Sequence, residues 1–135
     1  MNALSVLLVE DDDLDLRTAQ RAFFRRGLSQ LLHVAKDAGT ALQLLRGGES
    51  ALPMPCVVLL DQNLPGMSGL QFLEKLRGDP GLPLIDVYYV SAGLSQADAE
   101  QARRLGVRDC IHKEELGTDL APLFEILRGH GHLQS

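Results

Sequence analysis

The sequence lacks the long hydrophobic runs and the basic excess that mark membrane and nucleic-acid-binding proteins. No apolar run in the 135-residue chain approaches the roughly 20 residues that a transmembrane helix needs. The start of the chain, Met1–Ser5, has neither the basic flank nor the cleavage site of a signal peptide. The net charge of -5 at pH 7 argues against a general nucleic-acid or anionic-membrane surface. These absences predict a soluble cytoplasmic protein with no nucleic-acid or membrane partner.

The chain is also poor in cysteine, and it has no internal repeats, low-complexity segments or interdomain linkers. The two cysteines, Cys56 and Cys110, lie beside predicted strands. We interpret them as small buried apolar residues in a reducing compartment. With 45% hydrophobic residues, a single domain of this length can bury its own core. We therefore expect one domain over residues 1–128 and a flexible tail over residues 129–135.

What the sequence does contain is a regular alternation of apolar runs and helical patterns. The predicted strands lie near residues 4–9, 31–35, 56–60, 86–91 and within 107–112. The predicted helices lie near residues 13–26, 39–46, 69–77, 96–105 and 119–128. Such an alternation predicts a parallel sheet with helices on both faces. At this length we expect an α/β fold with five helices and the flavodoxin-like strand order 2-1-3-4-5.

The most informative strand, residues 57–60, leads directly into Asp61. Four consecutive apolar residues are typical of a strand that is buried on both faces. Asp61 would then emerge at the carboxyl end of the strand, where open α/β sheets place their chemistry. A turn with Pro65 and Gly66 follows. We therefore interpret Asp61 as a candidate reactive group.

Polar residues follow four of the five predicted strands. They are Glu10 and Asp11 after the first, Asp61 after the third, Ser91 at the end of the fourth and Lys113 after the fifth. In the order 2-1-3-4-5 these four strands are neighbours, so the side chains would gather at one edge of the sheet. Three clustered carboxylates favour a divalent cation, and oxygen ligands at an open site suit Mg²⁺. A carboxylate can attack phosphorus there, with Lys113 and the cation neutralising charge and Ser91 donating a hydroxyl.

On these residues the chain resembles the receiver domains of bacterial two-component response regulators over residues 4–128. The matching motifs are Glu10-Asp11, the turn Asp61-x-x-Leu-Pro-Gly-Met-x-Gly, Ser91-Ala92 and Lys113. The resemblance implies that Asp61 accepts a phosphoryl group from a histidine kinase, and that Ser91 and Lys113 contact this group. It also implies that Asp11, Asp61 and the backbone carbonyl of Asn63 bind Mg²⁺ directly, while Glu10 binds it through water.

The Glu10-Asp11 pair and a long approach to the fourth strand also resemble single-domain regulators that are paired with bacterial phytochrome kinases. Because no output domain is expected after residue 128, such a protein would signal through phosphorylation-dependent protein contacts.

Two positions depart from the family pattern. Glu114 follows Lys113 in place of proline, which predicts a trans peptide bond and a differently shaped loop. Cys110 stands where receivers often carry an aromatic switch residue, a role that Tyr88 and Tyr89 would partly assume.

Two other functions remain open. The first is a magnesium-dependent phosphatase or phosphotransferase of the haloacid dehalogenase type, with Asp61 as nucleophile. Such enzymes usually carry a second aspartate two positions later, where this chain has Asn63. The second is a pseudo-receiver, a binding module that never takes up phosphate. The sequence argues against it, because no required side chain is missing.

Two further groups of residues are interpreted from their setting. Asp12, Asp13 and Asp15 have the character of a solvated helix start, which the helix dipole favours. The last helix is apolar on more than one side. Its apolar residues are Leu120, Leu123, Phe124, Ile126 and Leu127. They indicate either dense core packing or a homodimer surface formed by the last strand and helix.

Overall fold

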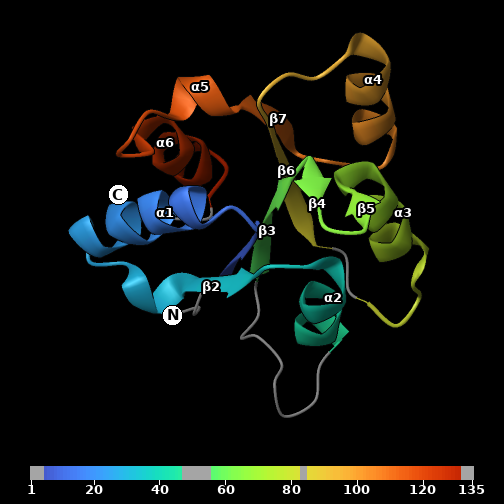
Figure 1. Ribbon diagram of the computed structural model, residues 1–135, viewed down its shortest axis with the longest axis horizontal. Coiled ribbons are helices and arrows are strands. Elements are labelled where there is room, and N and C mark those ends of the chain that lie inside the picture. Colours follow the sequence, from blue (N-terminus) through green and yellow to red (C-terminus); the bar gives the residue numbers. More distant parts are fainter. Residues whose placement is uncertain (1–4, 47–55, 83–84, 132–135) are drawn as a thin grey trace.

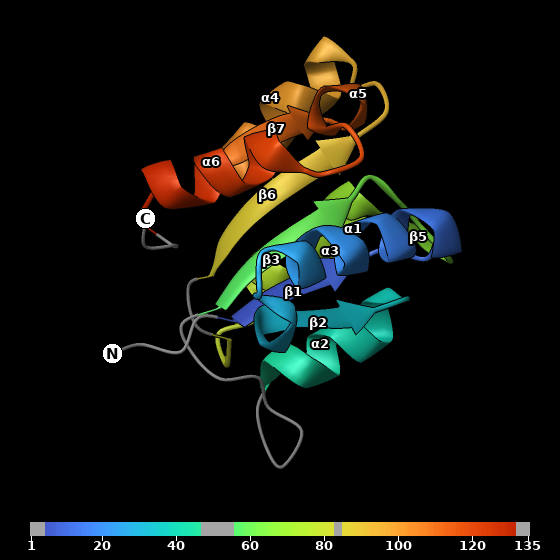
Figure 2. The same cartoon turned by 90° about the vertical axis from the view of Figure 1, so that its left-hand side faces the viewer.

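A parallel sheet of five strands forms the centre of the fold (Figure 1). The computed structural model describes residues 5–46, 56–82 and 85–131. The strands of the sheet are β1 Ser5–Val9, β2 Leu32–Ala35, β3 Cys56–Asp61, β6 Asp86–Ser91 and β7 Asp109–His112. Their order is β2-β1-β3-β6-β7, with every neighbouring pair parallel, as Figure 2 shows from β2 at the bottom to β7 at the top. This order confirms the predicted fold.

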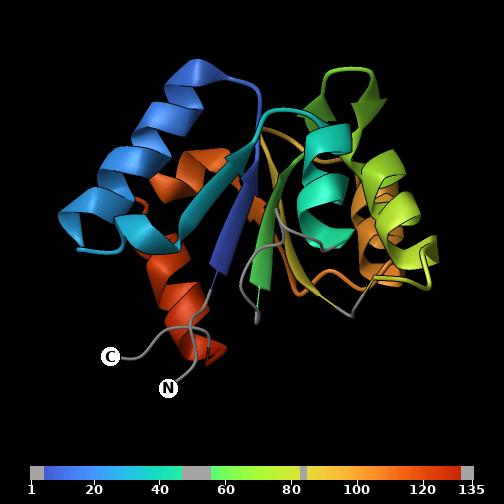
Figure 3. The same cartoon turned by 90° about the horizontal axis from the view of Figure 1, so that it is seen from below.

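The five predicted helices are present, and two single turns are added to them. The longer helices are α1 Asp13–Arg25, α2 Ala38–Arg46, α3 Gly69–Gly78, α4 Gln96–Arg104 and α6 Ala121–Gly129. The added turns are a 3-10 turn η1 at Ser29–Leu31 and a helical turn α5 at Lys113–Leu116. Helices α1 and α6 cover one face of the sheet, while α2, α3 and α4 cover the other (Figures 1 and 3). None of the helices in the described residues is long and apolar enough to cross a membrane.

The sheet separates two apolar cores, because side chains alternate between its faces along each strand. Leu7 of β1 belongs to the core under α2, α3 and α4. Its neighbour Leu8 belongs to the core under α1 and α6. All six residues of β3 are buried, which confirms that the apolar run before Asp61 is covered on both faces. Cys56, the first of them, is buried as a free thiol.

Capping residues in the sequence fix the starts of α1 and α3. The side chain of Asp12 accepts hydrogen bonds from the backbone N–H groups of Leu14 and Asp15 at the start of α1. Ser68 and Gln71 form a reciprocal capping box at the start of α3. The apolar spacing of α2 and α3 also predicts Leu44 and Leu70 as inward residues, and the structure differs at these two positions. Core positions are filled by Leu42 and Phe72, whereas Leu44 and Leu70 are only partly buried.

Helix α4 is thinly packed, as predicted by an apolar stripe that consists mainly of Ala99, Ala102 and Leu105. Ala102 is its one buried residue. Hydrogen bonds from the side chain of Arg77, on α3, hold the turn that follows α4. Its guanidinium donates hydrogen bonds to the carbonyl oxygens of Leu105 at 2.8 Å, Gly106 at 3.1 Å and Ile85 at 2.8 Å. Arg77 therefore ties α3 to the turn between α4 and β7 and to the segment before β6.

The last helix uses its apolar residues mainly in the core. Leu120, Leu123, Phe124 and Leu127 are buried, and Ile126 is partly buried against the same cluster. This burial supports core packing as the reason for the apolar sequence of α6. Beyond the helix, His130 Nδ1 lies 2.6 Å from the hydroxyl of Tyr88. The end of the predicted tail, residues 132–135, lies outside the described residues.

Candidate functional site

The carboxyl edge of the sheet brings the predicted polar residues together. Asp61 is the last residue of β3 and Ser91 the last residue of β6, and both are buried. Glu10 directly follows β1 and is only 4% exposed, and its backbone N–H continues the ladder by donating to the carbonyl oxygen of Ala35. Since β3 lies between β1 and β6, Asp61 lies at the centre of this edge.

A small antiparallel hairpin follows Asp61. It consists of β4 Asn63–Leu64 and β5 Met67–Ser68. Its turn contains the predicted Pro-Gly pair, and Gly66 has the positive φ of 80° that favours glycine after proline in a tight turn. The backbone N–H of Asn63 donates to Asp61 Oδ2 at 3.0 Å. The hairpin therefore helps to fix the orientation of the Asp61 carboxylate.

Gly69 lets the hairpin and α3 come close to the sheet. Its backbone N–H donates to the carbonyl oxygen of Gln62 at 2.7 Å. A Cβ atom at this position would lie 2.7 Å from the carbonyl oxygen of Asp61 and 2.6 Å from the ring of Tyr89. Any larger residue would have to push against the backbone that carries Asp61.

Three carboxylates converge on one point of this edge. Glu10, Asp11 and Asp61 each offer one oxygen, and these oxygens all lie within 4.8 Å of one another. Asp11 is exposed, whereas the other two are buried. An all-oxygen donor set with one open side suits a hard divalent cation that keeps part of its water shell.

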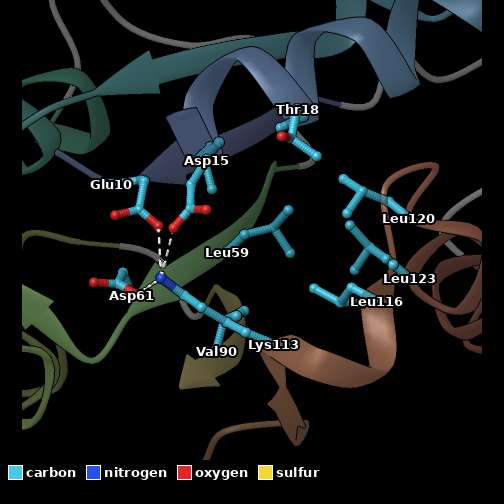
Figure 4. Close-up of a pocket in the computed structure, with 13 residues that line it drawn as sticks. Glu10, Asp15, Thr18, Leu59, Asp61, Val90, Lys113, Leu116, Leu120 and Leu123 are labelled. Carbon is cyan, nitrogen blue, oxygen red and sulfur yellow. Dashed lines mark hydrogen bonds and ion pairs between the residues drawn. The ribbon is translucent and has the colours of Figure 1, made fainter. Parts of the chain in front are cut away.

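Lys113, which directly follows β7, reaches the same point, as Figure 4 shows. It begins the single helical turn α5. Its Nζ lies 2.7 Å from Asp61 Oδ1 and 3.2 Å from Glu10 Oε1. A third carboxylate, Asp15 Oδ2 on α1, lies 2.8 Å from the same nitrogen.

The interpretation of Asp15 as a merely solvated residue is therefore wrong. A signal for its position is present in the sequence, because Asp15 precedes Ala19 by four residues and Ala22 by seven. These spacings place all three residues on one side of a helix, and both alanines are buried. Asp13, by contrast, pairs with Lys36 at 2.7 Å, and both side chains are largely exposed.

Burial and charge shift the titration of two groups in this cluster. Burial, and next the charge of Asp61, raise the pKa of Glu10 to about 7. For Lys113, burial lowers the pKa, but hydrogen bonds to Asp15 and Asp61 outweigh it and raise the pKa above its usual value. In the absence of a cation, Lys113 is therefore the positive charge that holds these carboxylates together.

The side chain of Lys113 crosses one end of an apolar pocket. The pocket lies between α1 and the segment from α5 to α6 (Figure 4). Leu59 and Val90 of the sheet line it together with Leu116, Leu120 and Leu123. These apolar walls exclude water from one side of the ion pairs and so strengthen them.

The two tyrosines of β6 are buried on opposite faces of the sheet. Tyr88 belongs to the core under α1 and α6. Tyr89 belongs to the other core, and its hydroxyl has no hydrogen-bond partner within the described part of the chain. Cys110 is half-buried and lies opposite Tyr89 in the β6–β7 pairing. A switch role for the tyrosines stays a prediction.

Comparison with known proteins identifies the family. The family model described as the response regulator receiver domain matches residues 6–124. The chain belongs to this family. The receiver is 28% identical over 126 residues to the response regulator Rcp1 of Synechocystis, which covers 92% of the chain and 84% of Rcp1. Seven further curated relatives are longer proteins, and the receiver spans less than two thirds of the length of each.

Solved structures of phytochrome-associated regulators are similar to this receiver. The phosphorylated cyanobacterial phytochrome response regulator RcpA is 29% identical with a TM-score of 0.73, over 96% of this chain and 91% of RcpA. The Mn²⁺-bound form of Rcp1 is 25% identical with a TM-score of 0.75, over 98% of this chain and 96% of Rcp1. These similarities confirm the predicted resemblance to receivers of the phytochrome branch.

Proposed function

We propose that this receiver accepts a phosphoryl group on Asp61 from a histidine kinase, with Mg²⁺ as cofactor, and signals through phosphorylation-dependent protein contacts. The observation that carries the proposal is the environment of Asp61. One of its oxygens contacts Lys113 at 2.7 Å, and the carboxylate shares a cluster with Glu10 and Asp11. The carboxylate of Asp61, the ammonium of Lys113 and a set of oxygens that could bind a divalent metal ion thus meet at one point.

The transfer that we propose forms a bond between a carboxylate oxygen of Asp61 and phosphorus. The bond between phosphorus and the histidine nitrogen of the kinase breaks, and its electron pair stays on that nitrogen, which takes up a proton. Little covalent assistance is needed, because phosphoryl transfer has a loose transition state. Lys113 would neutralise charge on the phosphoryl oxygens, and Ser91, buried at the end of the neighbouring strand, would contact them through its hydroxyl.

The residues present fit a bound Mg²⁺ ion. Asp11 and Asp61 would hold it directly and Glu10 through water, since their oxygens cluster within 4.8 Å. The backbone carbonyl of Asn63 would complete the protein ligands. When bound, the ion supplies positive charge that neutralises the transferred phosphoryl group. The Mn²⁺-bound structure of Rcp1 supports a divalent cation in this family.

The sensor partner that we propose is a histidine kinase of the bacterial phytochrome type. Its support is the similarity to RcpA, a regulator described as belonging to a phytochrome.

A homodimer through β7 and α6 stays a separate prediction. Analytical ultracentrifugation with and without a phosphate mimic tests it, and a monomer at high concentration in both conditions would contradict it.

Phosphotransfer from candidate kinases, and from acetyl phosphate with Mg²⁺, tests the function directly. Intact-mass measurement should show the addition of one phosphoryl group to the unaltered protein and none to Asp61→Asn. Label on the Asp61→Asn variant would contradict the site assignment. An unchanged mass of the unaltered protein under every condition would favour a pseudo-receiver, and turnover of small phosphate esters would favour the phosphatase.

A further inference from the structure

Asp15 is an acidic residue at the site to which no part of the proposed function assigns a task. Its Oδ2 lies 2.8 Å from Lys113 Nζ, and its side chain is 42% exposed. The same nitrogen contacts Asp61 Oδ1 and Glu10 Oε1. Because a lysine ammonium has three N–H donors, it has one carboxylate acceptor for each of them. Figure 4 shows the three side chains converging on this nitrogen.

Asp15 differs from the other two acceptors because it lies outside the metal-like cluster. Glu10 and Asp61 both belong to the group of oxygens that could hold an ion, and Asp15 does not. A divalent cation and the ammonium of Lys113 would therefore compete for Glu10 and Asp61. Asp15 is the acceptor that remains available to Lys113 when a cation takes the other two.

We propose that Asp15 is a positioning residue, which keeps Lys113 beside the site by accepting its ammonium when a cation takes the oxygens of Glu10 and Asp61. The inference rests on the proposed function, because it takes the Glu10–Asp11–Asp61 cluster as the Mg²⁺ site. Without the Asp15 carboxylate, the acidic partners that Lys113 retains among the described residues are Glu10 and Asp61. When Mg²⁺ then displaces the ammonium from Glu10 and Asp61, the ammonium has no Asp15 carboxylate to move to, and Mg²⁺ binding is weakened.

Titration calorimetry with Mg²⁺ alone tests the inference. We expect Asp15→Asn to raise the Kd for Mg²⁺ about fivefold, the size expected for one partly exposed ion pair. Asp13→Asn is the matched control, since it removes the same charge from the same helical turn but from a carboxylate that pairs with Lys36. Its Kd should stay nearly unchanged. Asp15→Glu should restore most of the affinity, because it keeps a carboxylate within reach of Lys113.

A double-mutant cycle separates positioning from a simple charge effect. In a Lys113→Gln background there is no ammonium to position, so we expect Asp15→Asn to leave the Kd nearly unchanged. An equal loss of affinity in both backgrounds would mean that Asp15 acts on the cation through its own charge, and the proposal would be wrong. Thermal unfolding of every variant confirms that the compared proteins are folded.

The behaviour of the unaltered protein distinguishes this inference from the proposed function. If the unaltered protein binds no Mg²⁺ and takes up no phosphoryl group, the proposed function fails and the role of Asp15 with it. If it binds Mg²⁺ and is phosphorylated on Asp61, but Asp15→Asn and Asp13→Asn have the same Kd, only the positioning role is wrong.

Discussion

Glu10 should make the stability of the cation-free protein fall as the pH rises. Burial, and next the charge of Asp61, raise the pKa of Glu10 from 4.5 to about 7. A carboxyl group whose pKa is raised on folding binds its proton more tightly in the folded state than in the unfolded state. Its contribution to stability is therefore fully present below pH 4.5 and is lost as the pH rises through about 7.

The size of this effect follows from the pKa shift. At about 1.4 kcal/mol for each pKa unit, the full contribution is about 3 kcal/mol. Most of it should be lost between about pH 5 and pH 8, because only a small part of the titration in the unfolded state lies below pH 5. Glu10→Gln keeps the shape of the side chain but removes its titration, so this part of the pH dependence should disappear.

Urea unfolding followed by circular dichroism, with a chelator present, measures the difference. The free energy of unfolding of the unaltered protein should fall by about 2 to 3 kcal/mol more than that of Glu10→Gln between pH 5 and pH 8. Parallel pH dependence of the two proteins would refute the reasoning, because Glu10 would then titrate alike in both states. Added Mg²⁺ should stabilise the unaltered protein more at pH 8 than at pH 5, since the cation needs an ionised carboxylate.

Three further predictions concern packing and hydrogen bonding, two of them beside the site and one at the opposite edge of the sheet. Gly69→Ala should lower the free energy of unfolding by about 2 kcal/mol in urea titrations, because its Cβ would press on the Asp61 carbonyl; a stability equal to that of the unaltered protein would contradict this. Tyr89→Phe should raise that free energy by about 1 kcal/mol, since it removes a buried hydroxyl that lacks a partner in the described residues. Arg77→Met should lower it by about 2 kcal/mol and speed amide hydrogen exchange in α4, because three carbonyl oxygens lose a charged donor. The exposed neighbour Lys75 is the control, and Lys75→Met should change neither measurement.

Local patterns predict the elements of this fold because each depends on residues that are close in sequence. The unbroken apolar run before Asp61 predicts β3, and all of β3 is buried. Asp12 and Ser68 cap α1 and α3 through backbone groups only two or three residues away. The weak apolar stripe of α4 likewise predicts its thin packing.

Which side chains touch across the sheet could not be predicted in the same way. The sequence pattern predicts that Asp15 is solvated at the start of a helix, and that Leu44 and Leu70 are core residues. The exact phase of a helix against the sheet decides such cases, since a rotation of about 100° separates adjacent residues of a helix. That phase depends on the packing of the whole layer and not on the local pattern.

The sequence by itself determined the class of fold, the order of its strands and the kinds of polar group that follow them. These features depend on hydrophobic periodicity and on chain topology, which are present in the order of the residues. Only the tertiary structure decided that Lys113 meets Asp15, from which it is 98 positions away. That contact exists because α5 begins at Lys113 and because α1 packs over the same face of the sheet. Residues that are far apart in sequence come into contact only through the packing of whole helices and strands, which no local pattern specifies.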